Sequence, residues 1–390
     1  MKHVIRQECG KNVVSLYFAS RWLLPVILLF ASSVFALDVN VVNYGAVPDD
    51  AIEDTVAIQA AADAVYAAGG GTIGFPSGTY IVKIVKVKPG ETFTTLGSGA
   101  AAVLKLIDAT QAEKDAPVPK LLTWRRMFTV DGVTYNGTTD SAPITFRNLH
   151  FNMNRQNQGP YDNYEIEHQA AIFLAGNNAN PGKVVGIVED CNFYDGAGDA
   201  IGANCNVSLQ VRRCTATDVF RGGVVITGGH TDVLVDDFTA GGSIHKTGID
   251  IEVDSPGYDS SMAVDVTMRN MHLRGDFDVG LGAGSTFTGC NITVDESPVL
   301  VYAKDATVSI ADSAFNIGSS VFGNHLYYAK DVTFTNCTFN AIKAADDTGT
   351  SFPIMYILFG TVSNQSATFD RCTWTIGNGI TASDTTYAIY

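Results

Sequence analysis

A four-residue phrase that recurs along the chain limits what the chain can fold into. Each copy has an apolar residue, any residue, usually Asn or Asp, and then a residue of a buried type. From residue 191 to residue 337 the steps between fourth positions are 23, 24, 33, 19, 23 and 24 residues. A period in the twenties, built from strand-type residues without a helical pattern, predicts one supersecondary unit stacked many times. The copies are residues 146–149, 188–191, 211–214, 235–238, 268–271, 287–290, 334–337 and 369–372, with a weaker copy at 310–313.

A second series of apolar segments runs in phase with the first. Two series that advance together imply coils of two or three short strands, with apolar side chains pointing inward from every coil. We therefore expect an all-β chain folded as a right-handed parallel β-helix. The segments of the second series are residues 170–174, 199–203, 222–226, 248–253, 278–281, 299–301, 326–328 and 355–358.

The first 36 residues have the pattern of a secretory signal peptide. Basic residues precede an apolar run over residues 22–36, which ends in the plausible cleavage site Val34-Phe35-Ala36. The run is shorter than the roughly 20 residues that a membrane-spanning helix needs. We expect a secreted or periplasmic protein, without stable membrane insertion once the signal is removed. Residues 37–390 are then a single β-helix domain.

The first coil is expected to carry a helical cap, because a solenoid must shield the apolar end of its stack. Asp54 is a suitable N-cap residue for a helix over residues 56–68, whose apolar face includes Val56 and Ile58. The three glycines at 69–71 end that helix.

The charge of the chain restricts its partners. Removal of residues 1–36 leaves 21 basic and 39 acidic side chains, a net charge of −18. We do not expect nucleic acid as a partner, because no basic stripe is present to displace counterions. A polyanionic sugar would need a local cationic cleft or a metal ion.

Cysteines recur at the fourth position of the phrase. We expect Cys191, Cys214, Cys290 and Cys337 to be buried on one sheet as small apolar side chains. An even number of cysteines in a secreted chain also permits disulfides, and Cys191 with Cys214 is the pair that adjacent coils would bring together.

Charged residues gather on one part of the second series. In residues 249–253 the isoleucines face the core, so Asp250 and Glu252 point outward together as exposed groups that contribute little to folding. Asp199 and Arg221 belong to the two preceding coils, at the matching place, and Lys246 begins the same coil. The predicted catalytic residues are Asp199, Arg221, Lys246, Asp250 and Glu252.

This cluster permits several chemistries. Two carboxylates, one protonated and one ionised, can hydrolyse a glycosidic bond. Lyase or epimerase chemistry instead needs a cation such as Arg221 to neutralise a uronate carboxylate, and Lys246, His245 or His230 as base. Outward carboxylates can also bind Ca²⁺, although we assign no metal site and no certain cofactor. A structural ion pair between Arg221 and Asp250 is the non-catalytic interpretation.

Long loops on a regular scaffold tend to carry binding groups, and residues 152–168 form such an insertion, rich in Asn, Gln and Tyr. We expect this loop and the coils beside the cluster to contact substrate. The predicted substrate-binding residues are His230, His245, Asp278, Arg155 and His168.

Residues 42–46, 50–72 and 75–80 resemble the N-terminal cap of the pectate-lyase-like superfamily. That superfamily includes polygalacturonase-like hydrolases, polysaccharide lyases, mannuronan C5-epimerases and phage tailspike depolymerases. Residues 105–108, after 96–99, are most similar to the epimerase module. The epimerase run Asp-Pro-His-Glu is replaced here by Gly-Asp-Ala-Ile-Gly-Ala-Asn at 198–204. The polygalacturonase pattern of paired Asp, Gly-His-Gly and Arg-Ile-Lys is absent from the sequence, and fold does not fix chemistry.

The resemblance implies a carbohydrate-active protein with a polysaccharide substrate. We expect lyase-type cleavage of a uronate-containing polymer, with an inverting glycoside hydrolase that uses the paired carboxylates as the alternative. A C5-epimerase and a non-catalytic glycan-binding or surface protein are the further alternatives. The sequence does not predict the sugar, the linkage or the oligomeric state.

Overall fold

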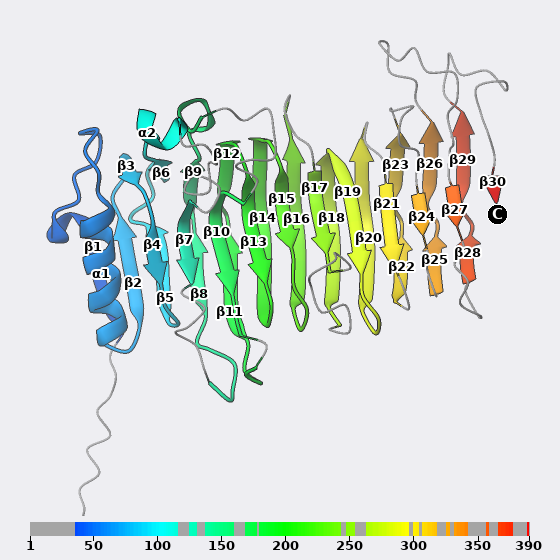
Figure 1. Ribbon diagram of the computed structural model, residues 1–390, viewed down its shortest axis with the longest axis horizontal. Coiled ribbons are helices and arrows are strands. Elements are labelled where there is room, and N and C mark those ends of the chain that lie inside the picture. The colour runs from blue at the N-terminus through cyan, green and yellow to red at the C-terminus, as the bar shows by residue number, and fades with distance from the viewer. Residues whose placement is uncertain are drawn as a thin grey trace, which may run out of the picture. The chain divides into compact units, whose positions relative to one another are not determined.

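The chain folds as a parallel β-helix, whose coils lie side by side along one axis (Figure 1). Every strand pairing in the described part of the chain is parallel. The computed structural model describes residues 36–115, 125–130, 137–159, 168–177, 179–242, 247–253, 263–295, 299–303, 306–317, 325–327, 331–341, 356–358, 366–376 and 388–389.

Each coil contributes to two sheets, here called the large sheet and the small sheet. The large sheet has 19 strands: β1 (Leu37–Asn40), β2 (Gly71–Phe75), β3 (Thr79–Val82), β5 (Glu91–Thr95), β6 (Ala102–Leu106), β8 (Ile144–Arg147), β9 (Leu149–Asn152), β11 (Val184–Glu189), β12 (Asn192–Gly196), β14 (Val207–Val219), β16 (Asp232–Gly241), β18 (Asp265–Arg274), β20 (Thr286–Asp295), β22 (Thr307–Ala311), β23 (Ala314–Ile317), β25 (Asp331–Thr335), β26 (Thr338–Ala341), β28 (Ser366–Asp370) and β29 (Thr373–Ile376). The small sheet has 11 strands: β4 (Val85–Val87), β7 (Arg126–Val130), β10 (Ala170–Ala175), β13 (Asp199–Asn204), β15 (Gly222–Ile226), β17 (Thr247–Glu252), β19 (Asp276–Leu281), β21 (Val299–Ala303), β24 (His325–Tyr327), β27 (Tyr356–Leu358) and β30 (Ala388–Ile389).

The recurring phrase is the corner at which each coil of the large sheet bends. Its third residue has a positive φ, for example 51° at Asn148 between β8 and β9 and 55° at Asp190 between β11 and β12. Asn and Asp tolerate this left-handed conformation better than other residues with a side chain, which explains their recurrence there. Even Arg213 and Arg371, at the same position of other coils, adopt it, with φ of 51° and 52°.

One copy of the phrase is displaced from the position that the sequence predicted. The left-handed residue of β20 is Asn291, and Cys290 pairs with Arg269 on the outer face. Cys290 is therefore exposed, and the prediction that it faces the core is wrong. The apolar spacing could not distinguish 287–290 from 289–292, because both begin and end with residues that a core accepts.

The other cysteines of this series occupy the core as predicted. Cys191, Cys214 and Cys337 are buried free thiols. Burial raises the pKa of the Cys191 thiol, and the adjacent Cys214 thiol raises it further. Cys372, in the last described coil, is only partly buried.

Aromatic side chains stack from coil to coil inside the helix. The rings of Phe151 and Phe193 are stacked with centroids 4.8 Å apart, and those of Phe334 and Phe369 with centroids 5.3 Å apart. Parallel in-register strands place equivalent side chains about 4.8 Å apart, so the repeat itself generates these ladders.

Helix α1 (Thr55–Ala67) covers the first coil, as expected of a cap (Figure 1). Its buried face is Ile58, Ala61, Ala62 and Val65, whereas Val56 is 82% exposed, contrary to the sequence prediction. Asp54 lies at the N-cap, but its carboxylate accepts hydrogen bonds from the N–H groups of Val47 and Ile81 instead of capping the helix.

Three short helical segments complete the described secondary structure: η1 (Val41–Tyr44), α2 (Gln111–Lys114) and η2 (Arg155–Asn157). Among the residues that the structure describes, no helix has the length and apolar character of a membrane span. Residues 1–35 of the proposed signal segment lie outside the described residues.

Candidate functional site

Four neighbouring strands of the small sheet, β13, β15, β17 and β19, carry the predicted cluster. Asp199 opens β13 and pairs in register with Gly222 of β15. On β17, Asp250 lies between Val225 of β15 and Asp278 of β19. The side chains on either side of Asp250 in sequence are buried in the core, so Asp250 points to the outer face.

Arg221 connects three carboxyl groups on this face. Its Nη1 donates to Oδ2 of Asp199 at 2.8 Å, and its Nη2 donates to Oε2 of Glu252 at 3.0 Å. The same Nη2 lies 3.7 Å from Oδ2 of Asp250. Because Arg221 precedes β15 while Asp250 pairs with Val225, the arginine side chain must run along the outer face to reach them. We call Asp199, Arg221, Asp250 and Glu252 the Arg221 cluster.

The Arg221 cluster is buried, which corrects the prediction that Asp250 is an exposed group. Asp250 is 5% exposed, Asp199 5% and Arg221 6%, and only the side chain of Glu252 reaches solvent, at 37%. Strand alternation predicts which face a side chain points to, but it does not predict what covers that face. Here the Arg221 guanidinium lies among the carboxyl groups of Asp199, Asp250 and Glu252.

Burial and charge together raise the pKa of Asp199 to about 8. Removal of the carboxyl from water is the largest cause, Arg221 opposes it, and the negative charges of Asp250 and Glu252 add to it. One guanidinium can balance only one of three carboxylates, so the cluster retains a proton near neutral pH. Within the described structure, Oδ1 of Asp199 is buried without a hydrogen-bond partner.

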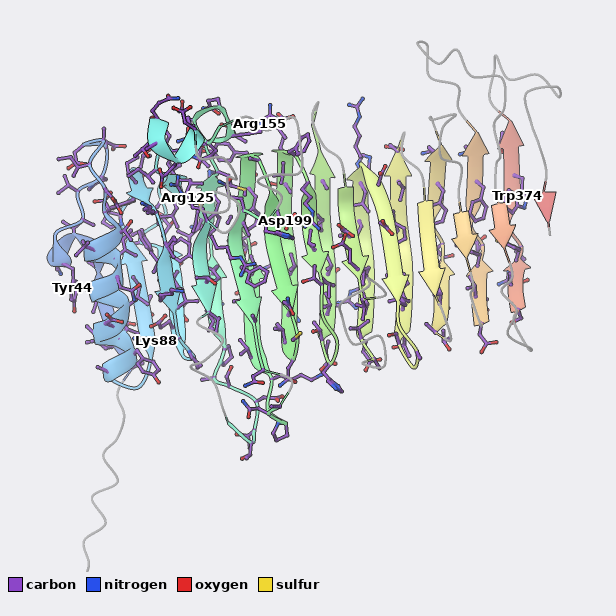
Figure 2. The ribbon with its side chains drawn as sticks, in the orientation of Figure 1. Tyr44, Lys88, Arg125, Arg155, Asp199 and Trp374 are labelled. Atoms are coloured by element: carbon purple, nitrogen blue, oxygen red, sulfur yellow. The ribbon has the colours of Figure 1, made fainter. Side chains whose placement is uncertain are left out.

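The predicted substrate-binding residues are spread over several coils, and Asp278 is paired in register with Asp250 of the Arg221 cluster. His230 is exposed in the turn between β15 and β16, where its N–H donates to Ala263 O, and no described contact joins it to the Arg221 cluster. Arg155 lies in η2, near the loop segments around α2, whereas Asp199 lies further along the coils (Figure 2). His168 precedes β10, and Asp278 lies one strand beyond Asp250. Lys246 and His245 lie outside the described residues.

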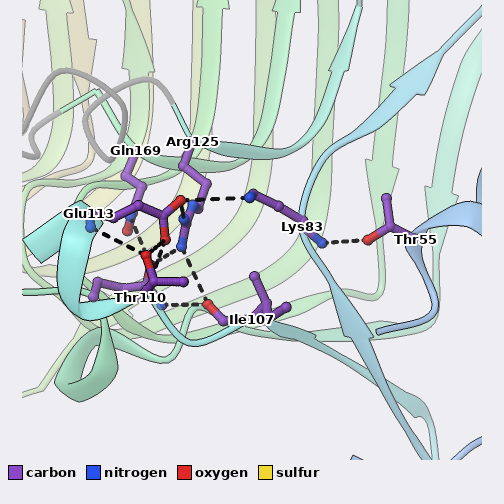
Figure 3. A network of polar contacts seen from close by, with 8 residues as sticks. Thr55, Lys83, Ile107, Thr110, Glu113, Arg125 and Gln169 are labelled. Atoms are coloured by element: carbon purple, nitrogen blue, oxygen red, sulfur yellow. Dashed lines mark hydrogen bonds and ion pairs between the residues drawn. The ribbon is translucent and has the colours of Figure 1, made fainter. Parts of the chain in front are cut away.

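Sequence reasoning missed a buried arginine network at the start of β7 (Figure 3). Arg125 is 2% exposed, and its Nη2 lies 2.5 Å from Oε1 of Glu113. Its Nη1 donates to Oε1 of Gln158 at 3.1 Å, which joins the α2 segment to the end of η2. Partial burial would raise the pKa of Glu113, but hydrogen bonds from Thr110 and Arg125 lower it to about 2. The sequence signal was the pair Arg125-Arg126 directly before an apolar strand in an acidic chain.

The donor set of the site does not resemble a metal centre. Among the described residues, no group of three or more His, Cys, Asp or Glu side chains is arranged to hold a metal ion. In this part of the chain the carboxylates of the cluster surround a guanidinium, so the Ca²⁺ site considered from the sequence has no support there.

The first coils match a known family. The family profile described as rhamnogalacturonase A/epimerase, pectate lyase-like, matches residues 38–115. Over 80 residues the chain is 41% identical to mannuronan C5-epimerase AlgE5 of Azotobacter vinelandii, which covers 18% of this chain and 8% of that protein. Over 82 residues it is 40% identical to AlgE4 of the same organism, covering 19% and 15%. The chain thus spans less than a sixth of the length of these relatives, and the matches confirm the resemblance to the pectate-lyase-like superfamily.

Several solved structures are similar over most of the chain. The A-module of mannuronan C-5 epimerase AlgE4 of A. vinelandii is 16% identical with a TM-score of 0.48, covering 90% of this chain and 97% of that one. The family 28 exopolygalacturonase of Yersinia enterocolitica is 14% identical with a TM-score of 0.46, covering 91% and 77%. PfbA, a surface adhesin of Streptococcus pneumoniae, is 11% identical with a TM-score of 0.47, covering 87% and 92%.

Proposed function

We propose that this chain, a β-helix protein of the pectate-lyase-like superfamily, is a secreted enzyme that cleaves a uronate-containing polysaccharide by β-elimination at the Arg221 cluster. The observation that carries the proposal is that one buried guanidinium serves three carboxyl groups. Such a cluster keeps one carboxyl protonated and another ionised at the same pH, which is the requirement for paired acid and base catalysis.

The two roles follow from burial and charge. Asp199 retains its proton and is the general acid that protonates the departing glycosidic oxygen. Glu252 is half-buried and paired with Arg221, so we assign it as the base that removes the proton at C5 of the uronate. Arg221 already pairs with three carboxyls and is assigned to hold them in these states. Lys246 and His245, which the sequence analysis considered as bases, are instead assigned here as the cations that neutralise the uronate carboxylate beside the reacting carbon.

The relatives support chemistry at C5. The matched proteins are mannuronan C5-epimerases, and an epimerase at C5 must remove the same proton that an elimination removes. An inverting hydrolase is the second candidate, because a protonated Asp199 and an ionised Glu252 are also the acid and base that it would use. The two reactions break different bonds: elimination removes the C5 proton and breaks the C4–O bond, whereas hydrolysis uses the base to activate water, which attacks C1 and breaks the C1–O bond.

The test is incubation of the purified chain with polymannuronate, polyguluronate, polygalacturonate and a neutral glucan. Elimination creates a C4–C5 double bond, so near-ultraviolet absorbance and reducing ends should rise together on a uronate polymer. Reducing ends without absorbance would instead establish hydrolysis. Deuterium uptake at C5 without cleavage would establish epimerisation, and no reaction on any polymer would favour a glycan-binding protein.

The residue assignment is tested with Glu252→Gln and with a matched control, Asp236→Asn. Asp236 pairs with the exposed Arg269 on the large sheet, whereas the Arg221 cluster lies on the small sheet. Glu252→Gln should abolish turnover of the best substrate, whereas Asp236→Asn should retain it. Retained turnover in Glu252→Gln would remove that residue from the mechanism.

A further inference from the structure

The two ends of the large sheet differ. At the N-terminal end, α1 covers the first coil. At the other end, β28 and β29 form the last described coil of this sheet, and no described strand pairs with them on the side away from β25 and β26. Trp374 lies on β29 at this end and is 43% exposed, although its ring is stacked on Phe339 with centroids 4.3 Å apart (Figure 2). A ring of the aromatic ladder is therefore partly open to solvent.

The backbone of β28 and β29 presents hydrogen-bonding groups on this unpaired side, here called the C-terminal edge. The carbonyl of Asp370 accepts an N–H of the preceding coil, and the N–H of Thr373 donates to a carbonyl of that coil. Because the backbone groups of successive strand residues point to opposite sides, those of Phe369 and Trp374 point to the C-terminal edge. Residues 366–376 contain no Pro or Lys that would protect such an edge, so it can pair with another strand.

The bend between β28 and β29 makes the C-terminal edge suitable for a two-fold axis. Arg371, whose φ is 52°, forms the bend, and the strands on its two sides have five and four residues. A two-fold axis that passes through the bend, in the plane of the coil, lays β28 antiparallel on β29 of a second copy. The same axis lays β29 on β28 of that copy, so the contact is closed and uses one surface twice.

The side chains that face each other in this arrangement are complementary. Ala367 lies opposite Trp374 of the second copy, so a small side chain meets a large one, and Phe369 lies opposite Cys372. Ala367, Phe369 and Cys372 are partly buried side chains that pack against the core. The apolar side of one copy therefore continues into the apolar side of the other.

Charge favours a second copy as the partner. Asp370 and Arg371 are exposed at the bend, with 49% and 69% of their side chains accessible, and each lies opposite the other residue of the second copy. Residues 366–376 contain no other charged residue, so the C-terminal edge is neutral in a chain with 40 acidic and 25 basic residues. Association at this edge thus gains two pairs of opposite charge.

We propose that the C-terminal edge is the interface of a homodimer, in which two copies join end to end through antiparallel pairing of β28 with β29. The core of the β-helix then runs from one copy into the next, and the exposed face of Trp374 becomes covered. This interface does not depend on the proposed chemistry at the Arg221 cluster.

The test is sedimentation velocity of the purified chain over a wide range of concentrations, where a species of twice the monomer mass should appear. Ala367→Pro removes an N–H that points to the C-terminal edge and spares the bonds to β25, so it should abolish the dimer and retain the folded circular dichroism signal. Arg371→Asp should weaken the dimer about a hundredfold, because both charge pairs become repulsive. Combining it with Asp370→Arg exchanges the charges and should restore the dimer. The matched control, Arg269→Asp, reverses an exposed charge in the middle of the stack and should dimerise like wild type.

Hydrogen exchange locates the interface. The amides of residues 366–376 should exchange more slowly at concentrations at which the dimer forms. A chain that is monomeric at every concentration would overturn the proposal, as would a dimer that both Ala367→Pro and Arg371→Asp leave intact. Oligomers that keep growing beyond the dimer would also overturn it, because a two-fold contact closes on itself. Turnover is measured separately, so failure of the dimer leaves the proposed function standing.

Discussion

Charged residues are arranged in opposite ways on the two sheets. At the corner of the large sheet, an outward row alternates in sign from coil to coil, and its register runs Arg147, Glu189, Arg212, Asp236 and Arg269. Arg147 pairs with Glu189 and Arg269 pairs with Asp236, and both arginines are about half exposed. On the small sheet, one buried arginine is surrounded by three acids.

The difference shows what each arrangement can do. A balanced row in water gains little stability from each ion pair and keeps every group in its ordinary charge state. In a buried cluster with two acids in excess, not every carboxyl can ionise. One carboxyl therefore keeps its proton, and burial of these groups lowers the stability of the fold. We therefore expect the small sheet to be sensitive to substitution and pH where the large sheet is tolerant.

The largest expected effect is on catalysis by Asp199→Asn. Loss of the general acid should lower kcat about a hundredfold or more, while the isosteric amide, which mimics the protonated acid, keeps the fold. Because burial raises the pKa of Asp199 to about 8, wild-type turnover should fall as pH rises through that value. Initial rates from pH 5 to 10 check both points. A variant that keeps wild-type kcat would show that Asp199 is structural.

Arg221→Ala should have the largest effect on stability. Breaking a buried ion pair by removing one partner typically costs about 3–5 kcal/mol, since buried carboxyls are left without their cation. The loss should be larger at pH 8 than at pH 5, where the acids can protonate. Urea unfolding at both pH values measures it, with the exposed Arg269→Ala as control. Similar losses for the two arginines would contradict the comparison of the sheets.

Glu91 offers a buried carboxyl outside the Arg221 cluster. It is fully buried on β5, where Oε2 accepts the Lys88 N–H, and burial raises its pKa to about 8. A raised pKa means that the folded state holds the proton more tightly than the unfolded chain. Stability from this group is complete below pH 4.5 and is lost as pH rises towards 8, by roughly 4–5 kcal/mol.

Glu91→Gln should remove this pH dependence. Thermal unfolding from pH 4 to 9 should show a falling Tm for wild type and a flatter profile for the variant. Glu53→Gln, at an exposed position near α1, is the matched control and should follow wild type. Parallel profiles for wild type and Glu91→Gln would show that Glu91 ionises in the fold without cost.

The sequence predicted the fold well because a solenoid repeats its physical requirements. Each coil needs apolar residues at the same two places and a left-handed corner, and Asn148 and Asp190 report that corner directly. The same repetition could not locate every copy, since Cys290 is as acceptable in a core as Ile292. The period of the repeat predicts the number of coils more reliably than it predicts which residues of a given coil face the core.

The sequence predicted that Asp199, Arg221, Asp250 and Glu252 lie together but not that the first three are buried, and Lys246 lies outside the described residues. Alternation along residues 249–253 placed Asp250 on the outer face, beside Arg221 and Asp199, as the structure has it. Alternation along one strand predicts the face of a side chain but not its burial, and Asp250, Asp199 and Arg221 are all buried. The cation–π contact of Arg126 with Phe173 was also missed, because it joins coils with no shared motif.

The smallest expected effect is on the rate of thiol labelling, which distinguishes the outer face of the large sheet from its core-facing side. Cys290 lies on the outer face and is exposed, whereas Cys191, Cys214 and Cys337 are buried. Burial raises the pKa of Cys337 to about 11, which further suppresses its reactive thiolate. In native protein at pH 8, Cys290 should therefore react first with a thiol reagent, and Cys290→Ser should remove that fast phase without changing Tm measurably. Protection of Cys290 from the reagent, located by peptide mass mapping, would mean that the corner lies at 287–290 after all.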